Sequence, residues 1–360
     1  MALTEVDLAR LNDNVFPATG SFGNRLINGD FSIAQRGTSF SGGTTNANDA
    51  YTLDRWYVLS EGSDTIDVSQ ETTEVPTGGK YSIALDVETT GEKFGIAQII
   101  EGINCVGLIG NTATLSFKAK VSDARIDTVK AAIVSWSGTE NTVTSDIISA
   151  WNADGTTPTL IANATFENTP ADLGVTTSWA TYSVTADIDT ASTANVIVFI
   201  WSDDATNPTA GDFLYLADVQ LEIGDTVTPF EHRPSGTELA LCQRYFINYA
   251  ATTSGSTGSF VHGTVNTGSS SGTETVWQGY IGISGKMRTD VPTVVLGGGA
   301  SSLTLRIRSG GSAVTINSIV CASFEKGIFT ITPASATNPD LIKQIRGNAA
   351  DGWLGLDAEL

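Results

Sequence analysis

The chain has 360 residues, a length that suits two domains rather than one small core. Hydrophobic residues make up 41% of it, which excludes wholesale disorder, while charged residues make up only 16%. Its net charge of −20 gives a surface that repels phosphate backbones and anionic lipids, so nucleic acid and membrane surfaces are not expected partners.

The first segment, residues 1–20, is predicted to stand apart from the domains that follow. Thr4 and Asp7 can cap a short helix that carries Leu8 and Leu11. Such a helix cannot bury its own apolar side chains, so we expect the segment to anchor the chain to a partner. It lacks the basic start and apolar run of a signal peptide, and no segment of the chain is apolar over the length of a membrane span.

Residues 21–234 carry one strand signal after another. Some segments, such as residues 114–121, alternate apolar and polar positions, which is typical of a sheet with one face in water. Others, such as residues 196–200, are continuously apolar and suit a central strand that is covered on both faces. The loops between them are rich in Gly, Thr, Asn and Asp. The pattern predicts a single jelly-roll β-sandwich.

Residues 235–246 break this pattern and predict a connector helix. Ser235-Gly-Thr-Glu238 has the form of a capping box, and Leu239 and Cys242 follow at helical spacing. Residues 247–360 then return to short strand segments between loops dense in Gly and Ser, which favours a second, smaller β-sandwich. The predicted fold is therefore all-β, with two jelly-roll-like β-sandwich domains joined by a short helix.

The three cysteines are Cys105, Cys242 and Cys321. An odd number, widely spaced and without a C-x-x-C pair, argues against a disulfide framework or a structural zinc site. We interpret them as buried thiols of a protein made in a reducing cytoplasm.

The sequence offers few candidates for catalysis. A nucleophile paired with a histidine would need His232 or His262, and both lie in turn-like or loop-like sequence that favours a structural role. Gly268-Ser-Ser-Ser-Gly272 lacks the strand and helix that flank a nucleophile elbow. Asp203 and Asp204 are adjacent, so on a strand their carboxylates would point to opposite faces, and a turn is favoured. We therefore expect no enzymatic activity and no required cofactor.

Seven tryptophans offer rings on which a ligand could stack. An exposed Trp can cover the apolar face of a sugar while polar neighbours bind the hydroxyl groups. Trp151 and Trp179 lie in polar surroundings and are the candidate glycan-binding residues, although a packed position is the alternative for Trp151. Trp56, Trp136 and Trp201 lie in apolar strand contexts and are predicted core residues.

Three groups of short stretches carry a resemblance to a known class of proteins. The stretches at the start of the first domain are Asn24-Arg-Leu-Ile-Asn-Gly-Asp-Phe31, Gln35-Arg-Gly37 and Tyr51-Thr-Leu-Asp-Arg-Trp56. Those at its end are residues 213–222, 228–234 and 239–245, and those of the C-terminal part are Lys286-Met-Arg288, Pro292-Thr293 and Asp357-Ala-Glu-Leu360. Together they resemble the jelly-roll modules and end domains of bacteriophage tail-fibre and other virion structural proteins.

The first domain also resembles the carbohydrate-binding sandwiches of glycoside hydrolases, which often carry a structural calcium where the first and last strands meet. That resemblance implies ligands at Asp218 and Asp30, with backbone oxygens near Asn28. Ser32 stands where an acidic residue commonly follows Phe31, and the loss of a carboxylate weakens a calcium site. The alternative is that Asp218 bridges strand ends.

The resemblance implies a virion structural protein, a tail fibre or related appendage that attaches to a host-surface glycan. Residues 1–20 would bind other virion proteins, and copies of the chain would form a homo-oligomer, by resemblance a homotrimer. The protein would be made in the host cytoplasm and released by lysis. The alternatives are a head fibre or capsid decoration protein and, from another class, a polysaccharide depolymerase or glycosidase.

Overall fold

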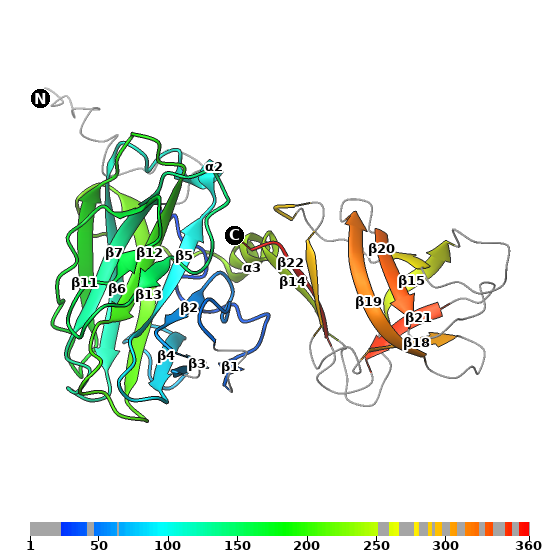
Figure 1. Cartoon of the computed structure of the whole chain (residues 1–360), viewed down its shortest axis with the longest axis horizontal. Coiled ribbons are helices and arrows are strands. Elements are labelled where there is room, and N and C mark those ends of the chain that lie inside the picture. Colours follow the sequence, from blue (N-terminus) through cyan, green and yellow to red (C-terminus); the bar gives the residue numbers. More distant parts are fainter. Residues whose placement is uncertain are drawn as a thin grey trace, which may run out of the picture. The chain divides into compact units, whose positions relative to one another are not determined.

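In the computed structural model, the regular secondary structure is almost entirely β-strand, as predicted (Figure 1). It describes residues 23–41, 47–62 and 65–250 and, further along the chain, the strands given below with residues 287–289, 292 and 358–359. The expected anchoring segment, residues 1–20, lies outside the described residues. The chain divides into two compact units, of which the first ends at Glu238 and the second runs from Leu239 to Glu359.

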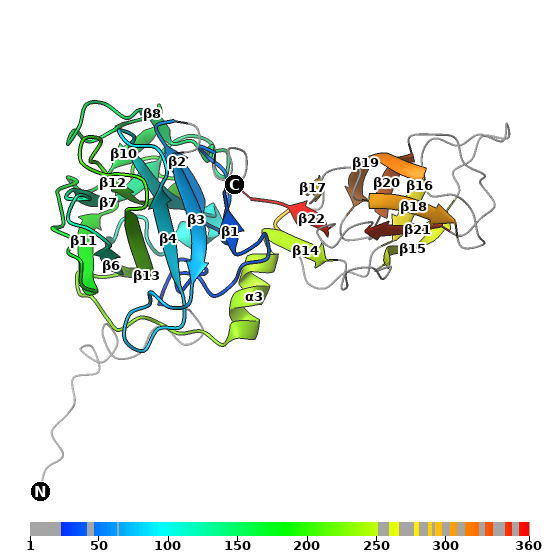
Figure 2. The ribbon, with the colours of Figure 1, turned by 90° about the horizontal axis from the view of Figure 1, so that it is seen from below.

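Two large antiparallel sheets form the first unit (Figures 1 and 2). Sheet A has the strand order β1-β3-β4-β13-β6-β11, and sheet B has the order β10-β7-β12-β5-β2. The strands of sheet A are β1 Ser39–Phe40, β3 Ile66–Glu71, β4 Ser82–Val87, β6 Thr112–Val121, β11 Ala180–Asp187 and β13 Phe213–Ile223. Those of sheet B are β2 Tyr57–Ser60, β5 Phe94–Ile100, β7 Val129–Trp136, β10 Ala164–Phe166 and β12 Asn195–Ser202. A short helix α2, Gly102–Cys105, follows β5, and a hairpin of β8, Ile148–Ala150, and β9, Thr159–Leu160, follows β7.

From β4 to β13 the long strands alternate between the two sheets, so their inner faces enclose one core in a jelly-roll-like sandwich. Sheet B is covered on its outer face as well, because the segment between β7 and β10 packs there around a second apolar cluster. All eight residues of β12 are consequently buried, as the continuously apolar sequence predicts. The outer face of sheet A is open in part: β11 shows the expected alternation of buried and more exposed residues from Thr181 to Asp187, whereas β6 shows it only from Phe117 to Val121.

The predicted helix forms as α3, Ser235–Gln243. It begins after Pro234, whose carbonyl oxygen accepts hydrogen bonds from the backbone N–H groups of Thr237 and Glu238 at 2.8 and 3.1 Å. The predicted capping box is not formed, because the Glu238 carboxylate bonds to the backbone N–H of Asn28 and to Arg233 instead. The local pattern assigns the Glu238 side chain to the helix cap, but in the structure it bonds to residues distant in the sequence or outside the helix.

In the second unit, six strands pair in the closed order β15-β16-β20-β19-β18-β21, and three others form the sheet β14-β22-β17. Their bounds are β14 Phe246–Ala250, β15 Ser259–Val265, β16 Trp277–Tyr280, β17 Thr293–Leu296, β18 Leu303–Ile307, β19 Val314–Ser323, β20 Ile328–Pro333, β21 Lys343–Gly347 and β22 Trp353–Asp357. The prediction of a second β-sandwich over residues 247–360 is corrected here to a barrel with an additional sheet. Alternating strands between Gly-rich loops are common to both architectures, so the sequence pattern does not specify closure.

Two of the C-terminal stretches that carry the virion resemblance meet in this unit. Arg288 donates from Nε to the carbonyl oxygen of Ala358 at 2.7 Å and from a terminal nitrogen to that of Glu359 at 2.9 Å. Hydrogen bonds from Arg288 therefore hold these two stretches against each other within the second unit. Within the described part of the protein, no helix is both long and apolar enough to cross a membrane.

Candidate functional site

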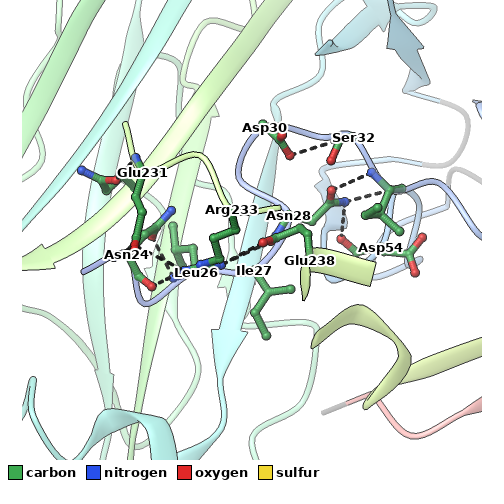
Figure 3. Close-up of polar contacts among 12 residues, drawn as sticks. Asn24, Leu26, Ile27, Asn28, Asp30, Ser32, Asp54, Glu231, Arg233 and Glu238 are labelled. Atoms are coloured by element: carbon green, nitrogen blue, oxygen red, sulfur yellow. Dashed lines mark hydrogen bonds and ion pairs between the residues drawn. The ribbon is translucent and has the colours of Figure 1, made fainter. Parts of the chain in front are cut away.

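The stretches at the two ends of the first unit form one polar cluster (Figure 3). Its centre is Arg233, whose side chain is only 4% exposed and whose guanidinium bonds to the carbonyl oxygens of Asn24 and Leu26. The same guanidinium lies 3.1 Å from a carboxylate oxygen of Glu238. Glu231 accepts the backbone N–H of Asn24 at 2.8 Å. Buried charge-assisted hydrogen bonds thus join the first described segment of this unit, residues 24–26, to its last, residues 231–238.

Asn28 orders the loop beside this cluster. Its side chain donates to the carbonyl oxygens of Ile33 and Asp54 and accepts the Ile33 N–H, each at 2.9 Å. Its own carbonyl oxygen accepts the Trp56 Nε1 hydrogen at 2.9 Å. Asn28 has a φ of 58°, a conformation that Asn tolerates better than most residues. At the next position any side chain is excluded, because a Cβ on Gly29 would lie 2.0 Å from the Val219 carbonyl oxygen.

The two residues that the resemblance assigns to calcium, Asp218 and Asp30, each contact another group of the protein. Asp218 Oδ2 forms an ion pair with Lys118 Nζ at 2.7 Å, and Asp30 Oδ1 accepts the Ser32 N–H at 3.2 Å. The carbonyl oxygen of Gly29 already accepts the Val219 N–H at 2.8 Å. Among the described residues, no group of three or more acidic, His or Cys side chains is arranged to hold a metal. In the structure Asp218 is thus an ion-pair partner and Asp30 closes a turn, and calcium binding at these residues stays a prediction.

Asp203 and Asp204 do not act as a pair either. The Asp203 carboxylate is fully buried and binds Lys93 Nζ at 2.7 Å and Lys130 Nζ. Asp204 Oδ1 accepts the backbone N–H groups of Thr206 and Asn207 at 2.9 and 3.1 Å, as the favoured turn interpretation requires. Burial opposes its ionisation, but these hydrogen bonds outweigh it and lower the pKa of Asp204.

The histidines give no sign of a catalytic arrangement in the described structure. His232 is exposed and packs edge-on against Phe230, with ring centroids 4.9 Å apart. His262 belongs to β15, and its side chain lies outside the described residues, as does the string Gly268-Ser-Ser-Ser-Gly272.

The tryptophans separate clearly by burial. Trp56 and Trp201 are fully buried and Trp136 is 8% exposed, which confirms their predicted core positions. Trp151 is also only 8% exposed and packs against Phe199 with ring centroids 6.0 Å apart, so its prediction as a glycan-stacking residue is wrong. Among the tryptophans whose side chains the structure describes, Trp179 alone is not buried.

Trp179 is part of an aromatic row on the outer face of sheet A. Its ring centroid lies 6.4 Å from that of Tyr215, and Tyr215 stacks on Phe213 at 5.4 Å with an interplanar angle of 12°. Phe213 and Tyr215 point outward because they alternate along β13 with the core residues Leu214 and Leu216. Trp179 and Phe213 remain half-buried, whereas Tyr215 is 8% exposed. The row therefore offers two accessible rings joined by a covered one.

Charged and polar side chains flank the aromatic row. Lys120 Nζ lies 5.3 Å from the Tyr215 ring centroid and forms an ion pair with Glu74 at 2.5 Å. Burial, followed by the nearby carboxylates of Glu74, Glu71 and Asp86, raises the pKa of Tyr215 to about 12. The Tyr215 hydroxyl therefore stays protonated near neutral pH and keeps its hydrogen-bond donor.

Asp86 lies beside this row, and the nearby carboxylates disfavour its ionised form. In the strand register it faces Phe213 on β13 and Asp67 on β3, so a carboxylate stands opposite a carboxylate. Burial, and then the charges of Glu88, Asp67 and Asp212, raises the pKa of Asp86 to about 6.

The raised pKa gives a prediction for stability against pH. The folded state retains the Asp86 proton at pH values where the unfolded chain has lost it. The contribution of protonated Asp86 to the free energy of unfolding is therefore complete below the unfolded pKa and is lost as pH rises through about 6. Since Asp86 is partly exposed, the free energy of unfolding of Asp86→Asn should exceed that of the wild type by only about 1 kcal/mol near pH 8. Near pH 4 the two should differ little. Urea unfolding of both proteins across this range measures the difference. A difference independent of pH, or equally large for the exposed control Asp225→Asn, would refute the assignment.

Comparisons with known proteins concern the fold. No protein-family model and no curated protein matches the sequence. The enzymatically active domain of tailspike protein 4 of bacteriophage CBA120 is 17% identical with a TM-score of 0.32, and the match covers 56% of this chain and 22% of that one. A putative sugar binding protein from Bacteroides thetaiotaomicron is 16% identical with a TM-score of 0.35, over 56% of this chain and 100% of that one.

The CBM22-1 xylan-binding domain of Paenibacillus barcinonensis Xyn10C is 15% identical with a TM-score of 0.29, over 53% of this chain and 94% of that one. The chain is thus similar to sugar-binding modules and to a part, about a fifth, of a phage tailspike domain. At these identities and TM-scores the likeness is one of fold alone.

Proposed function

We propose that this chain is a non-enzymatic attachment protein of a bacteriophage particle, a tail fibre or related appendage, which recognises a host-surface glycan through the outer face of sheet A. The observation that carries the glycan proposal is the half-buried Trp179 at the end of an aromatic row on an otherwise polar sheet face. The virion assignment rests on the sequence stretches that resemble tail-fibre proteins.

The chemistry of this face suits a saccharide. Trp179 and Phe213 can cover the apolar faces of sugar rings, and the ion-paired Lys120 and Glu74 beside them can bind hydroxyl groups. An open sheet face buries little of a ligand, so each site would bind weakly. A particle carrying many copies, which residues 1–20 attach to other virion proteins, would gain its strength from multivalency.

Replacing Trp179 by alanine should weaken glycan binding about tenfold, a loss of ~1.4 kcal/mol, because the accessible indole surface is removed. Trp179→Phe should retain part of the affinity, and Thr177→Ala, an exposed residue of the same loop, should bind like the wild type. The measurement is titration calorimetry with polysaccharides first selected on a glycan array. Equal affinities of Trp179→Ala and the wild type would exclude this face as the site.

One observation favours a second candidate, a polysaccharide depolymerase. Asp67 and Asp86 lie opposite each other next to Phe213, and the pKa of Asp86 is raised to about 6, as in an acid that donates a proton to a leaving group. Release of reducing ends from host envelope polysaccharide by the wild type, and its loss in Asp86→Asn, would establish this function. Binding without release supports the attachment protein.

A further inference from the structure

The edges of the two sheets in the first unit are protected unequally. The edge strand β1 has two residues and β10 has three, so neither offers a long row of free backbone groups. The edge of β2 is covered, because Val58 exchanges backbone hydrogen bonds with Asp49 and Ala50 at 2.8 and 2.9 Å. Of these three edges, two are therefore short and the third is covered.

The fourth edge, β11, is long and open. It runs for eight residues, Ala180–Asp187, pairs with β6 along its whole length, and is the outermost strand of its sheet in Figures 1 and 2. No hydrogen bond from another described residue reaches its backbone on the side away from β6. Alternate N–H and C=O groups of an edge strand point outward, so about half of those in β11 are available to a further strand.

The composition of β11 lacks the usual protection of an edge. Its sequence, Ala-Thr-Tyr-Ser-Val-Thr-Ala-Asp, contains no proline and no lysine, its pairing with β6 has no bulge, and its single charge is the last residue, Asp187. The chain as a whole carries a net charge of −20, so two copies repel each other over most of their surface. The seven uncharged residues before Asp187 are a place where that repulsion is low.

We infer that two copies of this chain associate through β11, strand against antiparallel strand, to form one continuous sheet. A two-fold axis normal to the sheet keeps the outer faces of both copies on the same side. In the register centred on Ser183, Ser183 faces its own copy and Thr181 faces Thr185 of the second copy. Tyr182 then faces Val184 of the second copy on the core side, where both are half-buried in the single chain.

This contact also places the candidate binding faces. Trp179 directly precedes β11, four residues from Ser183, so at about 3.4 Å per residue the two Trp179 positions lie roughly 27 Å apart on one face. A glycan chain that spans both would be bound bivalently. The bivalency rests on the proposed function, whereas the dimer contact does not.

The test is the mass of the full chain in solution, measured by light scattering during size-exclusion chromatography. The wild type should have twice the 37.7 kDa mass of one chain, and Ser183→Lys, which sets two like charges face to face, should be monomeric. Ser183 is exposed, so this change should leave the fold intact, as circular dichroism can verify. Mixing equal amounts of Ser183→Lys and Ser183→Glu should restore the dimer. Thr165→Lys, an exposed position on the edge strand β10, is the matched control and should remain dimeric.

A monomeric wild type overturns the inference. So does an oligomer, trimer included, that Ser183→Lys leaves intact or that fails to re-form in the Lys and Glu mixture. Binding of a monovalent oligosaccharide separates this result from the proposed function, because Ser183→Lys should bind it like the wild type while Trp179→Ala should not.

Discussion

Replacing Asp203 by alanine is expected to lower the free energy of unfolding of the first unit by about 3–5 kcal/mol. The Asp203 carboxylate is fully buried and is the counterion shared by two ammonium groups, those of Lys93 and Lys130, whose side chains are 0% and 8% exposed. Removing this carboxylate would leave both ammonium groups buried, with backbone carbonyl oxygens around them but without their counterion. Breaking a buried pair in this way costs far more than losing a surface ion pair.

The loss should also loosen the segment that covers sheet B. Lys93 Nζ donates to the carbonyl oxygens of Trp151, Ala153 and Thr156 at 3.2, 2.7 and 3.1 Å, and so binds this segment to the sheet. Urea unfolding gives the stability change, and amide exchange should show faster exchange around Trp151. The exposed control Asp225→Asn should change neither. A loss below about 1 kcal/mol for Asp203→Ala would show that the two lysines do not depend on this carboxylate.

The second large effect is expected at Arg233. Arg233→Met should cost about 3–5 kcal/mol, because it leaves the Glu238 carboxylate, 7% exposed, without its counterion. It also removes the donors to the carbonyl oxygens of Asn24 and Leu26, which are buried residues.

A double-mutant cycle isolates the charge pair. Glu238→Gln keeps an acceptor for the Asn28 N–H and removes the charge, so its loss should be smaller. The double variant Arg233→Met/Glu238→Gln buries no unpaired charge and should recover part of the loss of Arg233→Met. Thermal or urea unfolding of the four proteins measures the coupling. If the two losses simply add, Arg233 and Glu238 do not stabilise the fold as a pair.

Much of the first unit could be predicted from the sequence because its signals are local. The alternation in residues 114–121 gave β6, and the uninterrupted apolar run at residues 196–200 gave a strand covered on both faces. The helix after Pro234 was also predicted, although the side-chain partners of Glu238 were not. Local sequence patterns therefore predict where a helix or strand forms, but not which distant residues its side chains contact.

The errors arise where distant segments meet. Trp151 has polar neighbours in the sequence, but the segment that contains it folds onto sheet B, and its ring packs against Phe199. The ion pair of Asp218 with Lys118 could not be predicted either, because it depends on the register and the bulge of β13 against β6. Closure of the barrel likewise depends on which strands pair across the loops.

The candidate site could be predicted only in part from the sequence. Trp179 could be singled out by its polar surroundings, whereas Phe213 and Tyr215 were noticed only as part of a stretch that closes the domain. Their alternation with Leu214 and Leu216 is the signal that could have placed them on the outer face. Their contact with Trp179, which lies two strands away across β6, follows only from the sheet order.

The most direct test of glycan recognition follows the indole N–H resonances of the isotope-labelled protein during titration with a host-surface glycan. The resonance assigned to Trp179, by its absence in Trp179→Phe, should shift with added glycan, while those of the buried Trp56, Trp151 and Trp201 should not. An account in which this face binds the ligand is contradicted if the glycan binds and the Trp179 resonance stays unchanged.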